Sequence, residues 1–441
     1  MFIIQNITVL NLRPHEPFPT YQCIFISNDK MSVVGFDIGN ESCVVAVSRQ
    51  RGIGVVVNDE SKRETPALQD IKVFPFSVKE GPDGFPFIHV RYLGEQKSFT
   101  QTQVMGMALS NMKKLAEKNL NAEVVDCCIG IPIYFIDLQR RAVIDASTIA
   151  GLHPLRLMHE TTATALAYGI SKTDLPENEQ LNVAFVDIGH TSMQVSIAGF
   201  KKGQMKILAH SFDRSLGGRD FDEVLFHHFA EKFKIEYKID VFQNARACLR
   251  LRAACEKLKK MLSTNPEAPI NMQRLMDDKD VGGFIKRDEF EQISALILER
   301  VKKPFENALL EAQLRADNIY AVEVVGSGSR VPAVIKILTE FFGKKLTCTM
   351  NISESVAKGC ALQCAILSPT YRARDFMLYA LQELFLFSIA MTWHFSYQDS
   401  MYGNVEEQKS TIAFPKGNPI PCVKGTSKDQ YLQDWSLQNK K

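Results

Sequence analysis

The 441-residue sequence has no strong excess of one charge, because 52 Lys and Arg side chains nearly balance 50 Asp and Glu side chains. This balance gives no reason to expect nucleic acid or an acidic membrane as the main partner, but it leaves a phosphate ligand possible. Glycine and proline number only 25 and 18, which excludes collagen-like and low-complexity classes. The length is sufficient for more than one folded unit.

The ten cysteines form no CxxC pair and no Cys/His cluster with zinc spacing. They do not resemble a disulfide framework, and a reducing compartment fits them best. Cys127 and Cys128 lie in the apolar run 124–131, where we expect them to be small buried side chains of a strand.

A signal peptide and a long hydrophobic run are also lacking. Residues 1–12 are apolar but have neither a basic start nor a small-residue cleavage site. The most membrane-like stretch, residues 378–393, is short for a span and carries Gln382 and Glu383. We therefore expect a soluble protein without a membrane partner.

Short β-rich runs alternate with helical stretches, which is typical of an α/β fold. The expected strands are 32–37, 43–47, 124–129, 182–187, 193–198 and 321–325. The expected helices are 102–118, 138–150, 161–168, 221–233, 244–262, 286–312 and 331–342. Turn signals between them include Gly217-Gly218, Asn265-Pro266 and Gly282-Gly283.

One internal repeat indicates a duplicated architecture. Residues 33–47 (VVGFDIGNESCVVAV) and 183–197 (VAFVDIGHTSMQVSI) align without gaps and are identical at six of fifteen positions. Each copy is an apolar strand, an Asp-Ile-Gly turn and a second β-rich strand, which predicts a hairpin with a polar tip. Two such hairpins 150 residues apart predict two similar lobes with the functional site between them.

The two hairpin tips suit a phosphate ligand bound with a metal ion. A tight turn with glycine exposes consecutive backbone N–H groups, and Ser42 and Ser192 add hydroxyl donors. Asp37 and Asp187 would repel a bare phosphate, but they fit if Mg²⁺ or its waters lie between carboxylate and phosphate. One such turn would merely shape a hairpin, whereas two in matching register favour a clamp on phosphates, as phosphoryl transfer or hydrolysis requires.

Three further elements carry weaker signals. Residues 326–332 follow a strand and open a helix, so they could approach a nucleotide, although they match no standard nucleotide-binding motif. Residues 217–220 open the helix at Phe221 and could equally be an ordinary turn. On residues 250–263, one helix face carries charged and polar side chains, and spacing alone favours a solvated stripe. These side chains are Glu256, Lys259, Lys260 and Ser263.

In this order, the elements resemble the ATPase domain of the heat shock protein 70 family, within the actin-like nucleotide-binding superfamily. The resemblance covers roughly residues 32–368 and rests on several runs together. These are residues 35–39, 129–135, 159–169, the second hairpin, 217–222 and 326–332. The resemblance implies a two-lobed, actin-like ATPase fold with duplicated hairpin phosphate loops, and ATP or ADP with Mg²⁺ as cofactors.

Departures from the common family pattern resemble the 110-kDa branch, in a plant version. Residues 40–42 read Asn-Glu-Ser where typical members have two threonines, and residues 190–192 read His-Thr-Ser where they have Gly-Gly-Thr. Residues 326–330 read Gly-Ser-Gly-Ser-Arg in place of Gly-Gly-Ser-Thr-Arg. That branch acts chiefly as nucleotide exchange factor and holdase for 70-kDa partners.

The resemblance implies a set of site residues. Asp37, Glu160 and Asp187 are the candidate catalytic acids, and Asp37 and Asp187 would hold Mg²⁺ through water. The implied cofactor-binding residues are Gly39, Asn40, Ser42, Gly189, His190, Ser192, Gly217, Gly218, Glu256, Lys259, Lys260, Ser263, Gly326, Ser327, Gly328 and Arg330.

The resemblance extends to further positions, and at two of them this sequence departs from the family pattern. Pro132, Tyr134 and Asp137 match a relay between the nucleotide cleft and the interdomain surface. Gln194 replaces an acid of the family's cation site, so we expect weak or absent hydrolysis. Lys260 stands where the family often has Arg, which stacks better on adenine.

The resemblance also implies a domain organisation. Residues 1–30 are expected to be an extension of unknown origin outside the family, lobe I takes about 31–180, lobe II about 181–350, and a return helix 353–367. Near 67–72 the family has further strands, a helix and a lysine that assists hydrolysis, so we expect a truncated first lobe. Residues 369–441 resemble the shortened start of the substrate-binding β-sandwich, which suggests a splice variant or a mispredicted gene model.

Four functions remain open at this point. The favoured one is an ATP-binding, chaperone-related protein that serves 70-kDa heat shock proteins as nucleotide exchange factor and co-chaperone in protein folding and the stress response, with unfolded polypeptides as further partners. The alternatives are a weak chaperone ATPase, a truncated non-functional product, and a small-molecule kinase of the actin-like superfamily. We expect a cytoplasmic location, with the nucleus as a second candidate.

Overall fold

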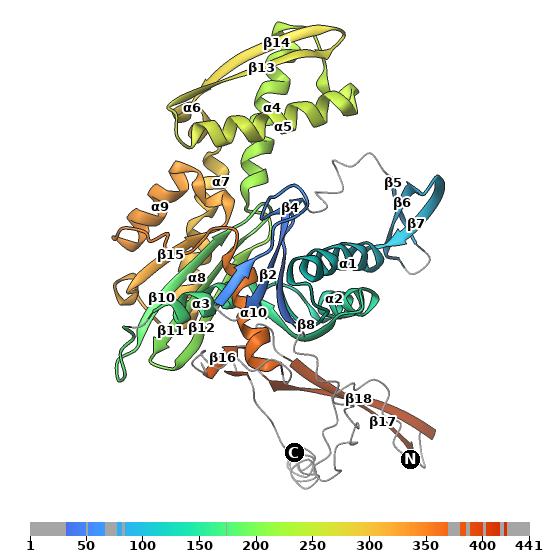
Figure 1. Ribbon diagram of the computed structural model, residues 1–441, viewed down its shortest axis with the longest axis vertical. Coiled ribbons are helices and arrows are strands. Elements are labelled where there is room, and N and C mark those ends of the chain that lie inside the picture. The colour runs from blue at the N-terminus through green and yellow to red at the C-terminus, as the bar shows by residue number, and fades with distance from the viewer. Residues whose placement is uncertain are drawn as a thin grey trace. The chain divides into compact units, whose positions relative to one another are not determined.

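The computed structural model describes residues 32–49, 52–66, 77–81, 84–172, 174–368, 380–384, 389–399, 403–414 and 419–420. The chain divides into a larger unit, Lys30–Leu381, and a smaller one made of Met1–Asp29 with Gln382–Lys441. The expected extension 1–30 lies outside the described residues. The larger unit combines two β-sheets with helices (Figure 1), which confirms the α/β prediction.

The first sheet has the strand order β3-β2-β1-β8-β9, with β4 added to β2. Its strands are β1 (Ser32–Ile38), β2 (Ser42–Arg49), β3 (Gly52–Val55), β4 (Thr65–Pro66), β8 (Val124–Ile131) and β9 (His153–His159). β1 pairs antiparallel with β2 and parallel with β8. Cys127 and Cys128 are fully buried in β8, as the sequence predicts.

The second sheet repeats this arrangement. It contains, side by side, β15 (Ala321–Val325), β10 (Leu181–Ile188), β11 (Met193–Lys201) and β12 (Gln204–Asp213). β10 pairs antiparallel with β11 and parallel with β15, just as β1 does with β2 and β8. The sheet topology therefore contains the duplication that the sequence repeat predicts.

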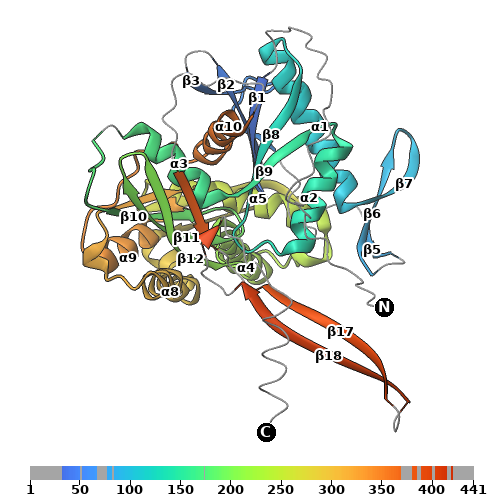
Figure 2. The same ribbon diagram turned by 90° about the horizontal axis from the view of Figure 1, so that it is seen from below.

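Helices α3 (Glu160–Ser171) and α10 (Ser355–Leu367) lie between the two sheets (Figure 2). Two glycines allow this close packing. A Cβ on Gly35 would lie 2.1 Å from the backbone nitrogen of Ala361, and a Cβ on Gly359 would lie 1.9 Å from the carbonyl oxygen of Ala163. Any side chain at either position would overlap the backbone of the neighbouring element.

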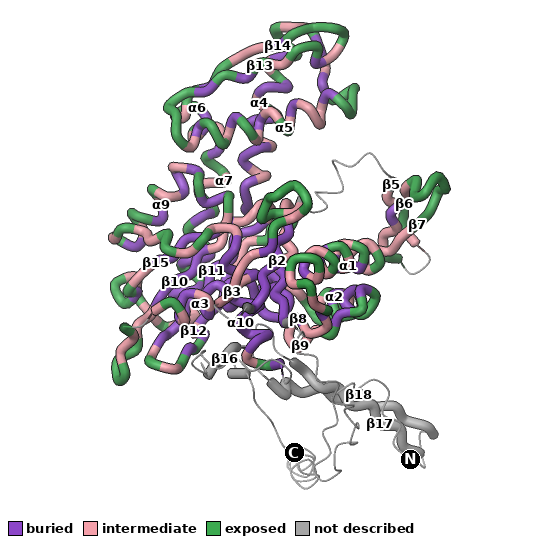
Figure 3. The backbone as a smooth tube through the Cα atoms, viewed as in Figure 1, coloured by how far each residue is buried: buried purple, intermediate pink, exposed green. Residues whose placement is uncertain are grey.

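The outer faces of the sheets are covered by other helices. α1 (Gln101–Leu120) and α2 (Asp137–Ile149) share a buried apolar cluster with the first sheet, and α8 (Lys302–Ala312) packs on β11 and β12 of the second. Buried residues concentrate in the sheet strands and in the helices between them (Figure 3).

The second lobe continues into α4 (Gly218–Glu236), η2 (Val241–Gln243), α5 (Ala245–Leu262) and the hairpin β13 (Glu267–Met276)–β14 (Lys279–Lys286). The turn expected at Gly282-Gly283 is wrong, because both residues lie inside β14. Asp277 and Asp278 make the turn instead, with φ of 53° and 54°. Aspartate tolerates this left-handed conformation better than most residues, so it can replace glycine there.

The single helix expected over 286–312 is also wrong. The chain forms α6 (Arg287–Ile293), α7 (Ala295–Arg300) and α8, with breaks at Ser294 and Val301. A continuous helix would place Pro304 in its interior, where proline removes a hydrogen bond. In α8, Pro304 falls in the first turn, where no intrahelical donor is needed. After η3 (Ala316–Asn318) and β15, the lobe ends with η4 (Ser327–Arg330) and α9 (Pro332–Phe342).

Two smaller groups of strands complete the described residues. β5 (Ser77–Glu80), β6 (Pro86–Tyr92) and β7 (Glu95–Thr100) form a three-stranded sheet just before α1, which the sequence did not predict. Near the C-terminus, β17 (Ile389–Asp399) pairs with β18 (Gly403–Phe414), and β16 (Ala380–Leu384) pairs with β19 (Pro419–Ile420). Within the described part of the chain, no helix is long and apolar enough to cross a membrane.

Candidate functional site

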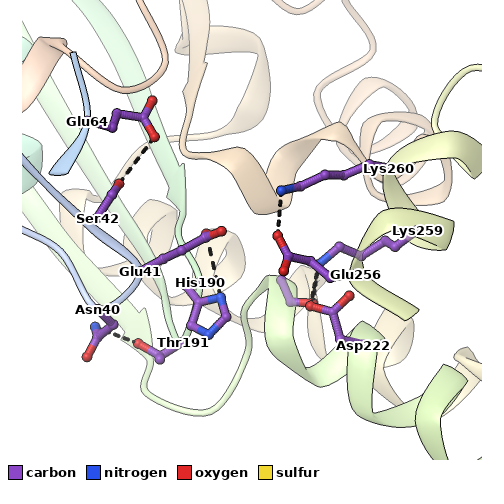
Figure 4. A network of polar contacts seen from close by, with 11 residues as sticks. Asn40, Glu41, Ser42, Glu64, His190, Thr191, Asp222, Glu256, Lys259 and Lys260 are labelled. Carbon is purple, nitrogen blue, oxygen red and sulfur yellow. Dashed lines mark hydrogen bonds and ion pairs between the residues drawn. The ribbon is translucent and has the colours of Figure 1, made fainter. Parts of the chain in front are cut away.

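The tips of the two repeated hairpins meet (Figure 4). Asn40 Nδ2 donates to Thr191 Oγ1 at 2.9 Å, and His190 Nδ1 lies 3.6 Å from Glu41 Oε2. The strand pairing ends at Ile38 opposite Cys43 in the first hairpin and at the matching positions in the second. The duplicated turns therefore bring together two segments that are 150 residues apart in the chain.

A cavity of about 630 Å³ adjoins the tips. Its walls include all three candidate catalytic acids, Asp37, Glu160 and Asp187, and most of the expected cofactor-binding residues. The cofactor-binding residues on the walls are Gly39, Asn40, Ser42, Gly189, His190, Ser192, Gly218, Glu256, Lys259, Lys260, Ser263, Gly326, Ser327 and Arg330. The fold thus gathers around one cavity residues that the sequence distributes over nearly 300 positions.

Gly217 and Gly328 do not line the cavity. A Cβ on Gly217 would lie 2.4 Å from the carbonyl oxygen of His190, and a Cβ on Gly328 would lie 2.7 Å from that of Gly189. Both glycines therefore pack directly behind the second tip. Because neither residue has a side chain, the loops that carry them can pack against the backbone of the second tip from outside the cavity.

The start of α4 fastens the second tip. The N–H groups of Gly218 and Arg219 donate to the carbonyl oxygens of Gly189 and His190, both at 2.9 Å. Asp220 Oδ2 accepts the N–H of Gly217 at 2.7 Å, so the first turn is capped. The 217–220 segment is therefore both a helix cap and a support for the second tip.

The third glycine-rich loop reaches Asp187. Gly326 has φ +81°, and a Cβ there would lie 2.5 Å from Asp187 Oδ1. Only glycine combines that conformation with that approach. The loop thus packs against the carboxylate of the second hairpin and carries Ser327 and Arg330 to the cavity wall.

Three acids at the cavity wall lie close enough to affect one another. Removal from water, then the nearby Asp187 and Glu64 charges, raise the pKa of Asp37 to about 8. Removal from water raises the pKa of Asp187 to about 6, and burial with the charges of Asp37 and Asp187 raises that of Glu160. Because the three carboxylates repel one another, the cluster favours binding of a cation or uptake of protons.

This donor set fits Mg²⁺ held through water. Among the described residues, no three His, Cys, Asp or Glu side chains form a group that could hold a metal ion directly. The acids instead face a cavity with backbone and hydroxyl donors opposite, so a hydrated cation between carboxylates and phosphates would satisfy both sides.

Gln194, on β11 of the second lobe, bonds to two residues of the first lobe. Its amide nitrogen donates to Glu160 Oε2, and its amide oxygen accepts the Ile133 N–H at 2.7 Å. Gln194 is nearly fully buried. The site therefore has an uncharged amide beside the three acids, and this amide donates a hydrogen bond where a further carboxylate would add negative charge.

The α5 face that spacing alone presents as a solvated stripe lines the cavity. Lys259 Nζ lies 2.6 Å from Asp222 Oδ2 and donates to Gly218 O at 2.8 Å. Lys260 Nζ lies 2.5 Å from Glu256 Oε1 (Figure 4). Lys259 is thus held in a largely buried pair that braces α5 against α4, while Lys260 is more exposed.

The three predicted relay residues do not all lie at the cavity. Pro132 lines the cavity, and Tyr134 donates from its hydroxyl to Ser192 Oγ at 3.3 Å. Asp137 does not line the cavity and pairs with Arg141 at 2.7 Å on α2. Only two of the three residues therefore touch the site.

Several lining residues carry no sequence signal. Residues 350–353, just before α10, line the cavity, and so does Glu64, whose Oε2 accepts from Ser42 Oγ at 3.3 Å. Arg63 Nη1 lies 2.5 Å from Glu354 Oε1, which joins segments 291 residues apart. These contacts depend on the fold alone.

Comparison with known proteins gives the family. The family model described as "Hsp70 protein" matches residues 33–68 and 67–414. The chain is 64% identical over 437 positions to "Heat shock 70 kDa protein 14" of Arabidopsis thaliana, covering 89% of this chain and 52% of the relative. It is 43% identical over 410 positions to "Heat shock 70 kDa protein 4" of Canis lupus familiaris, covering 82% and 48%.

The alignments also show a difference in length. The chain spans about half the length of the curated relatives it matches. The 437 positions aligned with the Arabidopsis relative take in 89% of 441 residues, or about 392, so about 45 positions of the relative face no residue of this chain. The two segments of the family match meet at residues 67–68. The matches nonetheless cover most of this sequence, and the chain belongs to the Hsp70 family.

Proposed function

We propose that this chain binds ATP or ADP with Mg²⁺ between its two hairpin tips, and that it serves 70-kDa heat shock proteins as nucleotide exchange factor and co-chaperone. Hsp70 family proteins bind these nucleotides with Mg²⁺ generally. The observation that carries the proposal is that both tips, three acids and one face of α5 line the same cavity.

Each wall of the cavity has a distinct part in this proposal. Asp37 and Asp187 hold Mg²⁺ through water, and the ion neutralises phosphate charge when bound. The backbone at Gly39 and Gly189 and the Ser192 hydroxyl donate to phosphate oxygens. The face of α5 and the loop at Gly326 receive the adenosine, since they lie on the same cavity beyond the tips.

Weak or absent hydrolysis is part of the proposal. Gln194 is neutral and already hydrogen-bonded to Glu160 and Ile133. The length difference from the Arabidopsis relative, together with the break in the family match at 67–68, is consistent with a missing first-lobe segment. We propose the cytoplasm as location, with the nucleus second, a role in the stress response, and unfolded polypeptides as further partners.

Thermal unfolding with and without Mg-ADP tests the nucleotide site. A ligand that binds only the folded state stabilises it by about 2.7 kcal/mol at a concentration 100 times Kd, so the unfolding midpoint should rise. Asp187→Asn should reduce this shift, while Glu60→Gln, which changes an exposed acid paired with Lys62, should keep it. A cooperative melt whose midpoint does not change with Mg-ADP or with Mg-ATP would contradict nucleotide binding.

Release of a fluorescent ADP from a 70-kDa heat shock protein tests the exchange role. The chain with bound Mg-ATP should accelerate release by tenfold or more, and Asp187→Asn should lose most of that effect. Binding of nucleotide without acceleration would contradict the exchange role. Strong ATP turnover stimulated by a J-domain protein would favour the chaperone ATPase instead.

A further inference from the structure

Glu41 reaches from the first hairpin tip toward the second lobe (Figure 4). Its Oε2 lies 3.6 Å from His190 Nδ1 on the second tip. The Glu256 carboxylate on α5 also lies near it, close enough for its charge to raise the pKa of Glu41. The side chain is 31% exposed and lines the cavity. One acidic side chain of lobe I therefore contacts the second tip of lobe II and lies near the charged face of α5.

Charged groups of both signs lie near Glu41. Burial and the neighbouring Glu256 raise the pKa of Glu41, while Lys260 and Lys259 counteract this rise. Glu256 in turn pairs with Lys260 at 2.5 Å, and Lys259 pairs with Asp222. Glu41 thus shares the cationic part of the cavity with the groups that would meet an anionic ligand.

A phosphate that enters between the tips meets the same donors. Phosphate is drawn to cationic and N–H groups at close range. His190 and Ser192 of the second tip, Lys260 of α5 and Glu41 of the first tip all line this cavity. Glu41 and an entering phosphate group carry charge of the same sign, so they repel each other within the cavity.

We propose that Glu41 is an internal anion of the cleft, which links the two lobes in the ligand-free protein and is displaced by the phosphates of an entering nucleotide. This inference rests on the proposed nucleotide site and adds the residue that limits its affinity for the charged part of the ligand. Because the competition is with phosphates, it leaves the binding of an uncharged nucleoside unchanged.

Stopped-flow binding of a fluorescent ADP with Mg²⁺ tests this role, with Glu41→Gln as the variant. Glutamine keeps the length of the side chain and removes its charge. The association rate should rise about 3–10-fold with little change in the dissociation rate, and adenosine affinity measured by calorimetry should stay the same. Glu60→Gln, which removes a charge at an exposed pair, should leave all values as in the wild type.

Other outcomes separate the alternatives. Faster dissociation and weaker Mg-ADP binding in Glu41→Gln would overturn the proposal, because Glu41 would then hold the bound nucleotide. Unchanged rates would overturn it as well. Absence of binding in both wild type and variant would overturn the nucleotide site itself, whereas binding by the variant alone would support the internal anion. Should Glu41→Gln melt without cooperativity, Glu41→Ala replaces it with the same expected rates.

Discussion

The two lobes have the same strand pairing, but equivalent positions in their first strands pack against different neighbours. Gly35 in β1 and Phe185 in β10 occupy the same position of the sequence repeat. Gly35 lies against the backbone of α10. Phe185 is fully buried, with its ring centroid 5.4 Å from that of Tyr168 and 6.1 Å from that of Phe200. One position thus needs no side chain in lobe I and a large one in lobe II.

The tips differ in the same manner. Glu41 stands in the first tip where Thr191 stands in the second, and Asn40 stands where His190 does. The Asn–Thr and Glu–His contacts therefore pair unlike residues across the gap. The two hairpins share their backbone pairing, because hairpin turns are local, whereas the side chains at their tips differ and contact different partners.

The largest expected loss of stability comes from truncating Phe185, which occupies in lobe II the repeat position that Gly35 occupies in lobe I. Phe185→Ala should lower the free energy of unfolding by about 3–5 kcal/mol, because it leaves a cavity among Tyr168, Phe200 and neighbouring apolar side chains. Urea denaturation measures this loss. Phe284→Ala, at a ring that is 59% exposed, serves as control and should change stability by about 0.5 kcal/mol. Equal effects of the two substitutions would contradict the contrast between lobes.

The first lobe should show the opposite sensitivity, with a smaller effect. Gly35→Ala adds a methyl group 2.1 Å from the Ala361 nitrogen, so α10 must shift, at a cost of about 1–3 kcal/mol. Gly189→Ala is the control, since the nearest atom to its added Cβ is 3.8 Å away. Differential scanning calorimetry should show a lower midpoint for the first variant only. A wild-type midpoint for Gly35→Ala would mean that α10 does not pack this closely.

The smallest expected effect is the pH dependence of stability that the two repeated aspartates, Asp37 and Asp187, produce. Their folded-state pKa values are raised above 3.8, to about 8 for Asp37 and about 6 for Asp187. Between pH 4 and these values the folded state holds protons that the unfolded state has lost, so stability falls as pH rises. From pH 6 to 8 these two aspartates should together lower the stability of the ligand-free chain by about 1 kcal/mol, less than their full shifts imply because both side chains line the cavity.

The substitutions separate the two contributions. Asp37→Asn should flatten the dependence above pH 6, whereas Asp187→Asn should flatten it mainly below pH 6. Urea denaturation at pH 5, 6, 7 and 8 measures both. A pH dependence that stays the same as wild type in both variants would show that neither aspartate has a raised pKa.

Much of the site could be predicted because its motifs are local. An Asp-Ile-Gly turn between two apolar strands predicts a hairpin from neighbouring residues alone, and its repetition identified both tips. The helix expected over 286–312 failed because apolar periodicity does not register the breaks at Ser294 and Val301. The β5–β7 sheet was missed because its strands are mostly half-buried or exposed, so its sequence alternates weakly.

The sequence by itself determined the family, the two hairpins and the residue types at their tips, since each depends on a short run of neighbours. The tertiary structure alone decided that Glu41 faces His190 and Glu256, that Gly217 and Gly328 lie behind the cavity wall, and that the 350–353 segment completes it. Those relations join residues that are far apart in the sequence, and their distances follow from how two sheets and two helices pack, which no local pattern encodes.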